Sequence, residues 1–221
     1  MCKKKERMSA KQMVTKNNSD NEALVQILPL DEEEALFMFR DSQALLEGHF
    51  RLTSGRHSNQ YMQCARVLQY PKYAARLGAE LAQRYQDAGV QVVIGPAMGG
   101  IVLAQEVARA LGGQVRSLFA ERENGAMSLR RGFSLESGEK VLVVEDVVTT
   151  GGSVQEVVEL VQNLGGDVVG VGVLVDRSGG EVQFGVRKEA VLTMHIVSYP
   201  PDDCLLCNQG LPVVKPGSRS V

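Results

Sequence analysis

Between residues 141 and 175 the sequence carries a strand–helix–strand pattern that strongly limits the fold. The apolar run at 141–144 predicts a buried strand. Valines 154, 157, 158 and 161 then repeat at the spacing of one helical face, and Gly165 provides a stop. A second apolar strand is expected at 168–175. Two strands joined by a helix run parallel, so the pattern predicts a mainly parallel sheet covered by helices on both faces.

The same alternation extends through most of the chain. Helical spacing predicts helices at 32–46, from Pro71 to near Gly89, and at 101–111. Apolar runs predict strands at 90–94, 115–119 and 190–197, with His195 packed in the last of these. A polar loop is expected at 120–132, and short strands and loops at 48–66, where they could cover a site. The predicted fold class is therefore α/β.

Length and composition favour a single small-molecule-binding domain. The 221 residues carry a net charge of -2 and have a pI near 6.0, which gives no general attraction to nucleic acid or to an anionic membrane. Four cysteines are too few for a disulfide framework, and this favours the cytoplasm. We expect a disordered tail at 1–20, one domain at 21–200 and a C-terminal extension at 201–221 lying on that domain.

The most informative motif is VLVVEDVVTTGGS at 141–153. Glu145 and Asp146 stand at the carboxyl end of the predicted strand, where their oxygens can accept hydrogen bonds from vicinal ribose hydroxyls. The hydroxyls and open backbone N–H groups of the next turn precede a helix and suit a phosphate; they belong to Thr149, Thr150, Gly151, Gly152 and Ser153. The motif matches neither the Walker loop nor the dinucleotide fingerprint.

Two acids followed by a Thr/Gly-rich turn resemble the phosphoribosyl pyrophosphate (PRPP) signature of type I phosphoribosyltransferases. The resemblance implies that PRPP binds along residues 145–153, including Val147 and Val148, and that Glu145 and Asp146 take part in catalysis. Gly99 and Gly100, in the segment GPAMGGI at 95–101, resemble the family's pyrophosphate turn. Many relatives carry a Lys at the position of Gly99.

Residues 46–198 resemble orotate phosphoribosyltransferases more specifically. Segment 48–63 is similar to the family's hood over the base, with Tyr61 and Met62 at the position of its aromatic pair. The Asp176–Gly180 turn resembles the family's Asp-Arg turn, which implies that Arg177 recognises orotate. The expected orotate site consists of Tyr61, Met62, Thr149 and Arg177. The implied reaction joins orotate to PRPP in pyrimidine biosynthesis.

Segment 120–132 occupies the place of the family's mobile catalytic loop. Its expected catalytic cations are Arg122, Arg130 and Arg131, because the central Lys and His of most relatives are absent. Which arginine replaces which family residue stays open. The resemblance further implies Mg²⁺ held mainly by the substrate, and a homodimer in which the loop reaches the partner's site.

Two other functions stay open at this point. The chain could transfer the phosphoribosyl group to another base, or it could be a nucleotide-responsive regulator that keeps the fold.

A pair of cysteines near the C-terminus lies outside these motifs. Cys204 and Cys207 form a C-x-x-C pair that could supply half of a zinc site, but no second pair with suitable spacing exists, so a structural or reduced pair is expected. His49 and His57 fall in the predicted hood and receive no chemical role.

Overall fold

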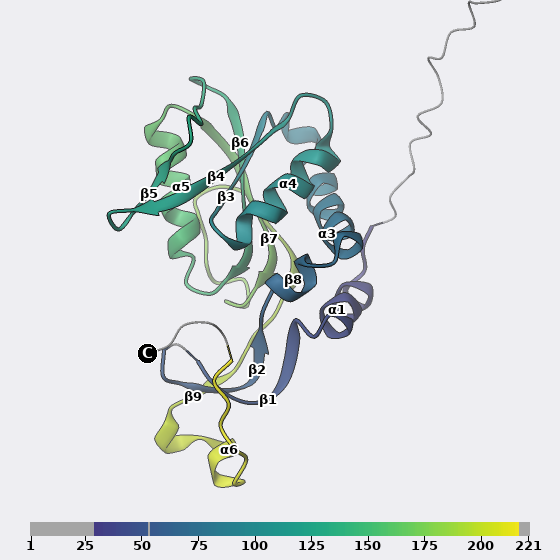
Figure 1. Ribbon diagram of the computed structural model, residues 1–221, viewed down its shortest axis with the longest axis vertical. Helices are drawn as coiled ribbons and strands as arrows, with labels where there is room; N and C mark the ends of the chain where they lie inside the picture. Colours follow the sequence, from purple (N-terminus) through teal and green to yellow (C-terminus); the bar gives the residue numbers. More distant parts are fainter. Residues whose placement is uncertain (1–28, 53, 217–221) are drawn as a thin grey trace, which may run out of the picture.

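The computed structural model describes residues 29–52 and 54–216, and a six-stranded sheet forms its centre (Figure 1). The sheet order is β5-β4-β3-β6-β7-β8. Five strands are parallel, and they are β3 (Val92–Pro96), β4 (Arg116–Glu123), β6 (Lys140–Val148), β7 (Asp167–Asp176) and β8 (Lys188–Thr193). The edge strand β5 (Ala126–Leu129) is antiparallel. The predicted α/β class is therefore confirmed.

Helices cover both faces of the sheet. On one face lie α3 (Pro71–Arg84) and α4 (Gly99–Leu111), while α5 (Gly152–Asn163) covers the other (Figure 1). Successive β6 residues divide between the faces: Leu142 and Val144 pack with the α3 and α4 side chains, and Val141 and Val143 with those of α5. Among the described residues, no helix combines the length and apolarity that crossing a membrane requires.

The first helix is shorter than the predicted 32–46. Helix α1 (Glu32–Asp41) begins at Asp31, whose side chain accepts from the Glu34 N–H, and it ends where Ser42 donates back to the Met38 carbonyl. Gln43 then adopts a left-handed backbone, with φ of 55°. The leucines that continue the helical spacing belong instead to a strand, because pairing in the hood outweighs their helix propensity.

The predicted polar loop at 120–132 is mostly a β-hairpin. Strands β4 and β5 pair from Ala120↔Leu129 to Glu123↔Ala126. Asn124 and Gly125 form the two-residue turn, both with positive φ, as hairpins joined by Asn-Gly commonly do. The predicted polar loop therefore contains two paired strands, because Asn-Gly favours a tight turn.

The hood is a small antiparallel sheet built from both ends of the described chain. Its strands are β1 (Leu45–Arg51), β2 (His57–Met62) and β9 (Ser198–Tyr199). Helix α2 (Ala65–Leu68) leads from the hood to α3, and the short turn η1 (Gln86–Ala88) follows α3. The small hood expected in this fold is therefore present, although its first strand begins at Leu45 and its third strand lies near the C-terminal end.

The C-terminal segment folds onto the hood. It contains two short helices, η2 (Pro201–Asp203) and α6 (Leu205–Asn208). Val214 then pairs with β1, donating to the His49 carbonyl and accepting from the Arg51 N–H. The segment therefore lies on the hood and is partly helical. The predicted tail at 1–20 lies outside the described residues.

Candidate active site

The turn between β6 and α5 forms an anion-binding loop. Gly151 has φ of 78°, and a Cβ there would lie 2.6 Å from the Val182 side chain, so only glycine fits without rearrangement. Helix α5 has no side-chain cap, so its first N–H groups remain available at the positive end of the helix dipole. A pocket opens here, and it is lined by Glu145, Val147, Val148, Thr149, Thr150, Gly151, Gly152, Ser153 and Val154.

The two acids of the motif lie inside β6, because the strand continues to Val148. Glu145 is buried and Asp146 is half-buried, and Glu145 Oε1 accepts from the Asp146 N–H at 3.1 Å. Burial, together with the neighbouring Asp146, raises the pKa of Glu145 to about 9. Burial also raises the pKa of Asp146. Two adjacent buried carboxyls therefore favour a ligand that supplies hydroxyl donors or positive charge.

The predicted pyrophosphate turn lies directly against these acids. A Cβ at Gly99 would be 2.5 Å from the Asp146 Cγ, and a Cβ at Gly100 would be 2.8 Å from the Gly95 Cα. The peptide between Ala97 and Met98 is cis. A lysine at position 99 would require Asp146 to move, so the glycine and the position of the carboxylate are coupled. The structure thus brings both predicted phosphate turns to one place.

Arg177 lies between the sheet and the hood. Its N–H donates to the Val148 carbonyl at 2.8 Å, which fixes the residue beside the phosphate turn. Its buried Nε has no hydrogen-bond partner among the described residues. Burial lowers the pKa of Arg177, while the adjacent Cys64 and Tyr61 raise it. A buried cationic donor without an acceptor is the arrangement expected where an anionic ligand binds.

The turn around Arg177 is held by its neighbour Asp176. This buried carboxylate accepts from both the N–H and the hydroxyl of Ser178, and from Lys188 Nζ at 2.6 Å. Although burial opposes the charge, the contacts with Lys188 and Ser178 hold the pKa of Asp176 below its usual value. Asp176 therefore orients the turn and leaves Arg177 to face the site.

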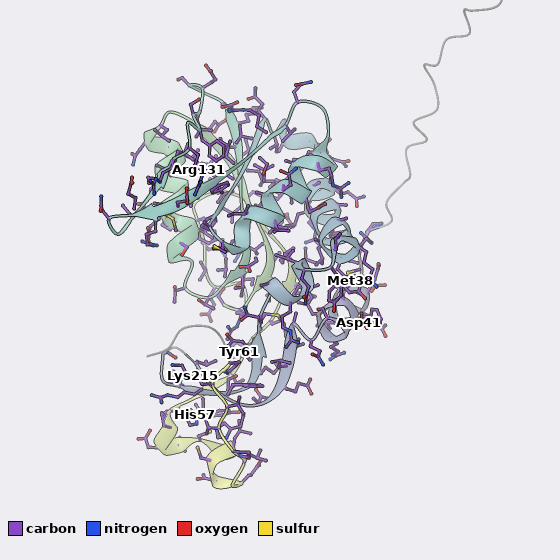
Figure 2. The ribbon with its side chains drawn as sticks, viewed as in Figure 1. Met38, Asp41, His57, Tyr61, Arg131 and Lys215 are labelled. Atoms are coloured by element: carbon purple, nitrogen blue, oxygen red, sulfur yellow. The ribbon has the colours of Figure 1, made fainter. Side chains whose placement is uncertain are left out.

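The two hood residues expected at the base differ in their surroundings. Tyr61 is half-buried, packs 5.9 Å from the Phe50 ring and donates to Gln63 Oε1 at 3.1 Å. Figure 2 shows Tyr61 at the end of the hood that faces the sheet. Met62 is buried in the main apolar cluster. The tyrosine is thus the better placed of the two to contact a base.

Acidic partners hold the lid arginines, and none of the three arginines lines the pocket. Arg130 pairs with Glu123 at 3.4 Å and Arg131 with Glu121 at 2.8 Å, both within the hairpin. Figure 2 shows Arg131 on this hairpin, far from the hood. Arg122 instead reaches Glu156 on α5 at 2.9 Å. Of the three, only Arg122 is tied to the helix that carries the phosphate turn.

Two residues near the site had no signal in the sequence. Cys64 Sγ contacts the Asp146 carbonyl at 3.5 Å, and burial together with the two acids raises the pKa of the thiol. Glu156 is relevant to the site because it forms the ion pair with Arg122 of the lid. Both contacts join residues far apart in the chain, so no local pattern could indicate them.

Comparison with known proteins places this site in a class. A family model described as "Phosphoribosyl transferase domain" matches residues 64–184, which is more than half of the chain and includes both phosphate turns. The chain is therefore a phosphoribosyltransferase by sequence, and the pocket at β6 and α5 lies within the matched residues.

The relatives narrow the class further. The chain is 65% identical over 192 residues to orotate phosphoribosyltransferase of Desulforamulus reducens and 63% identical to that of Pelotomaculum thermopropionicum, in each case over 87% of this chain and 100% of the relative. Orotate phosphoribosyltransferase from Aeropyrum pernix has a TM-score of 0.60 at 29% identity, with 72% of this chain and 92% of that chain covered. The chain belongs to the orotate phosphoribosyltransferase family.

Proposed function

We propose that this chain transfers the phosphoribosyl group of PRPP to orotate, giving orotidine 5'-phosphate and pyrophosphate. The relatives named orotate phosphoribosyltransferase, at up to 65% identity, support this pentosyltransferase reaction and its place in pyrimidine biosynthesis. One observation carries the proposal: a buried pair of carboxyls lies between two glycine turns suited to phosphates, beside a buried arginine donor without an acceptor.

Both glycine turns, the one between β6 and α5 and the one at Gly99, bind the phosphorylated sugar. The N–H groups at the start of α5 and the Thr149 and Thr150 hydroxyls hold the 5'-phosphate. Glu145 and Asp146 accept hydrogen bonds from the ribose hydroxyls, and the turn at Gly99 receives the pyrophosphate. These contacts fix the ribose carbon that reacts.

Transfer proceeds by displacement at that carbon. The bond from the ribose carbon to pyrophosphate breaks, and its electron pair leaves with pyrophosphate. A pyrimidine nitrogen forms the new bond to the same carbon, and its proton passes to the departing pyrophosphate. Positive charge from the lid stabilises the leaving group, and closure of the lid excludes water. Because Arg122 pairs with Glu156 on the helix that carries the phosphate turn, Arg122 is the lid cation we assign to this role.

Orotate is recognised between Arg177 and Tyr61. The orotate carboxylate can satisfy the unpartnered Arg177 Nε, and the half-buried tyrosine ring covers the base. Uracil lacks this carboxylate and would leave the buried donor unsatisfied, a cost of about 1–3 kcal/mol. We retain Thr149 and Met62 as predicted contacts of the base.

Magnesium fits the residues of this site. Mg²⁺ prefers oxygen ligands and often remains largely bound to substrate phosphates. Glu145 and Asp146 offer hard oxygen donors, and a nearby cation would offset the burial and the mutual repulsion that raise the pKa of Glu145. When bound with PRPP, the ion would neutralise charge on the pyrophosphate oxygens.

A homodimer also belongs to the proposal. Ile101, Val102 and Phe119 line an apolar groove on α4 and β4, and the nearby Met98 is 83% exposed. Exposed apolar surface of this kind is typical of protein interfaces. A second copy of the chain bound at this groove would lie next to the lid hairpin.

The cytoplasmic location expected from the low cysteine content stays a prediction.

A base panel tests the proposed function. Purified protein with Mg²⁺ and PRPP is offered orotate, uracil, hypoxanthine or adenine, and nucleotide formation is followed by chromatography. We expect orotidine 5'-phosphate from orotate and at least about 30-fold lower kcat/KM with uracil, which corresponds to about 2 kcal/mol. Preferred use of another base would overturn the orotate assignment, and no nucleotide with any base would favour a regulator.

A further inference from the structure

Four metal-binding side chains meet on the hood, away from the proposed catalytic site. They are His49 from β1, His57 from β2, and Cys204 and Cys207 from the start of α6. Their ligand atoms all lie within 4.8 Å of one another. His57 lies at the end of the hood next to α6, opposite the end where Tyr61 meets the sheet (Figure 2). The cluster therefore joins segments about 150 residues apart in the sequence.

The distances in the cluster match a tetrahedral metal site. With usual zinc bond lengths, two nitrogens should be about 3.4 Å apart and a nitrogen and a sulfur about 3.6 Å apart. His49 Nε2 lies 2.9 Å from His57 Nδ1, 3.6 Å from Cys204 Sγ and 3.8 Å from Cys207 Sγ. The His57 Nδ1 to Cys207 Sγ distance is 3.3 Å. Small shifts would place all four atoms around one ion.

A second hydrogen bond orients the first ligand. The other ring nitrogen of His49, Nδ1, lies 2.8 Å from the Leu211 carbonyl oxygen. A carbonyl can only accept, so Nδ1 carries the proton and the neutral ring presents a lone pair on Nε2. Metal-bound histidines usually have such a carbonyl partner. His49 is thus prepared as a ligand independently of the other three residues.

The sequence shows why this cluster escaped prediction. Only the Cys-x-x-Cys half is local. The two histidines reach the same face of the hood because β1 and β2 pair Arg51 with His57, which makes His49 a diagonal neighbour of His57. His49, His57 and Cys204 are each less than 8% exposed. The expectation that no second ligand pair exists therefore overlooked a pair created by strand pairing.

We propose that these four residues bind one structural Zn²⁺ ion that fastens the C-terminal segment to the hood. Two thiolates and two imidazoles form a closed tetrahedral set, as in structural zinc sites, and leave no position for a substrate. The bound ion links β1, β2 and α6. Because β2 also carries Tyr61, the ion stabilises the strand that covers the base. The metal site itself does not depend on the proposed catalytic function.

Metal content tests the site directly. The protein is expressed with zinc in the medium, dialysed against metal-free buffer and analysed by mass spectrometry of the elements. We expect about one zinc per chain in the wild type, in keeping with one four-ligand site. The variant Cys207→Ser, at a surface thiol, should retain only a small fraction of that zinc. The matched control Cys64→Ser changes a thiol outside the cluster and should retain it.

Cobalt provides a readout of the ligands. Co²⁺ added to the reduced, metal-free protein should give the strong visible absorption of a tetrahedral site together with a thiolate charge-transfer band. Both signals should disappear in Cys207→Ser and in His57→Asn. A wild type without zinc that also fails to give this cobalt spectrum after reduction would overturn the proposal, as would equal zinc in Cys207→Ser and wild type.

Limited proteolysis tests the fastening role. Chelation should expose the chain at 204–214 to cleavage while the sheet stays protected, because the ion binds the folded form only. Cleavage at these positions should be equally fast in Cys207→Ser with or without chelator. Unchanged cleavage of the zinc-loaded wild type on chelation would contradict the fastening role. These results do not depend on whether the protein uses orotate.

Discussion

At the residue scale, the two acids of β6 show how burial changes the protonation of carboxyl groups that face a ligand site. Sequence alone predicted that Glu145 and Asp146 bind the sugar, and it placed them at the carboxyl end of a strand expected to run from 141 to 144. In the structure they lie within it, and burial raises the pKa of both carboxyls. The chemistry was predictable because the residue types are local. Their protonation was not, because burial depends on the packing around them.

The pKa of Glu145 predicts a pH dependence of stability. Its carboxyl titrates near 4.5 when unfolded and at about 9 when folded. The folded state therefore holds a proton that the unfolded state loses, so this residue's contribution to stability falls as pH rises from about 4.5 to about 9. Glu145→Gln should flatten that fall. Urea unfolding at about pH 5.5 and about pH 8 measures it; equal pH dependence in both proteins would contradict the assignment.

Arg177 should affect orotate and leave the sugar nearly untouched. Removing a charged hydrogen bond costs about 2 kcal/mol, so Arg177→Ala should raise KM for orotate roughly 30-fold. Binding of PRPP should change little. The matched control is Arg187→Ala, an exposed arginine stacked on Tyr85. Steady-state kinetics with each substrate varied in turn test this role. An unchanged KM for orotate in Arg177→Ala would show that Arg177 does not contact orotate.

At the element scale, the strand–turn–helix unit was predicted best and the lid least well. Turn, helix and both strands follow from local periodicity and glycine placement, and the structure has all of them. The lid was predicted as a polar loop from its residue types, whereas the structure has a hairpin there. The hood's third strand, Ser198–Tyr199, pairs with β2 over a long separation, which no local pattern reveals.

The Arg122–Glu156 pair predicts opposite effects for its two partners. Arg122→Ala should lower kcat by about 10-fold or more, because it removes charge that stabilises pyrophosphate. Glu156→Gln should keep or raise kcat, since it frees the arginine. Both side chains are exposed, so neither change should alter stability by more than about 1 kcal/mol. Equal losses of kcat in the two variants would indicate that the pair itself, and not the free arginine, is needed.

At the scale of the whole molecule, the apolar groove on α4 and β4 predicts association of two chains. Val102→Asp introduces a charge at a side chain that is 42% exposed, so it should disrupt the dimer without unfolding the chain. Light scattering should report a dimer for the wild type and a monomer for the variant. Leu164→Asp, at the end of α5 and 45% exposed, serves as the control. A fully active monomeric wild type would contradict the prediction.

The account depends most on the binding of PRPP where β6 meets α5. Calorimetric titration of the folded protein with PRPP in the presence of Mg²⁺ measures this directly. We expect saturable binding, with proton release detected by comparing buffers, since the ligand favours the charged forms of Glu145 and Asp146. Asp146→Asn should fold as the wild type does and bind more weakly. Folded wild-type protein that takes up no PRPP would contradict the account.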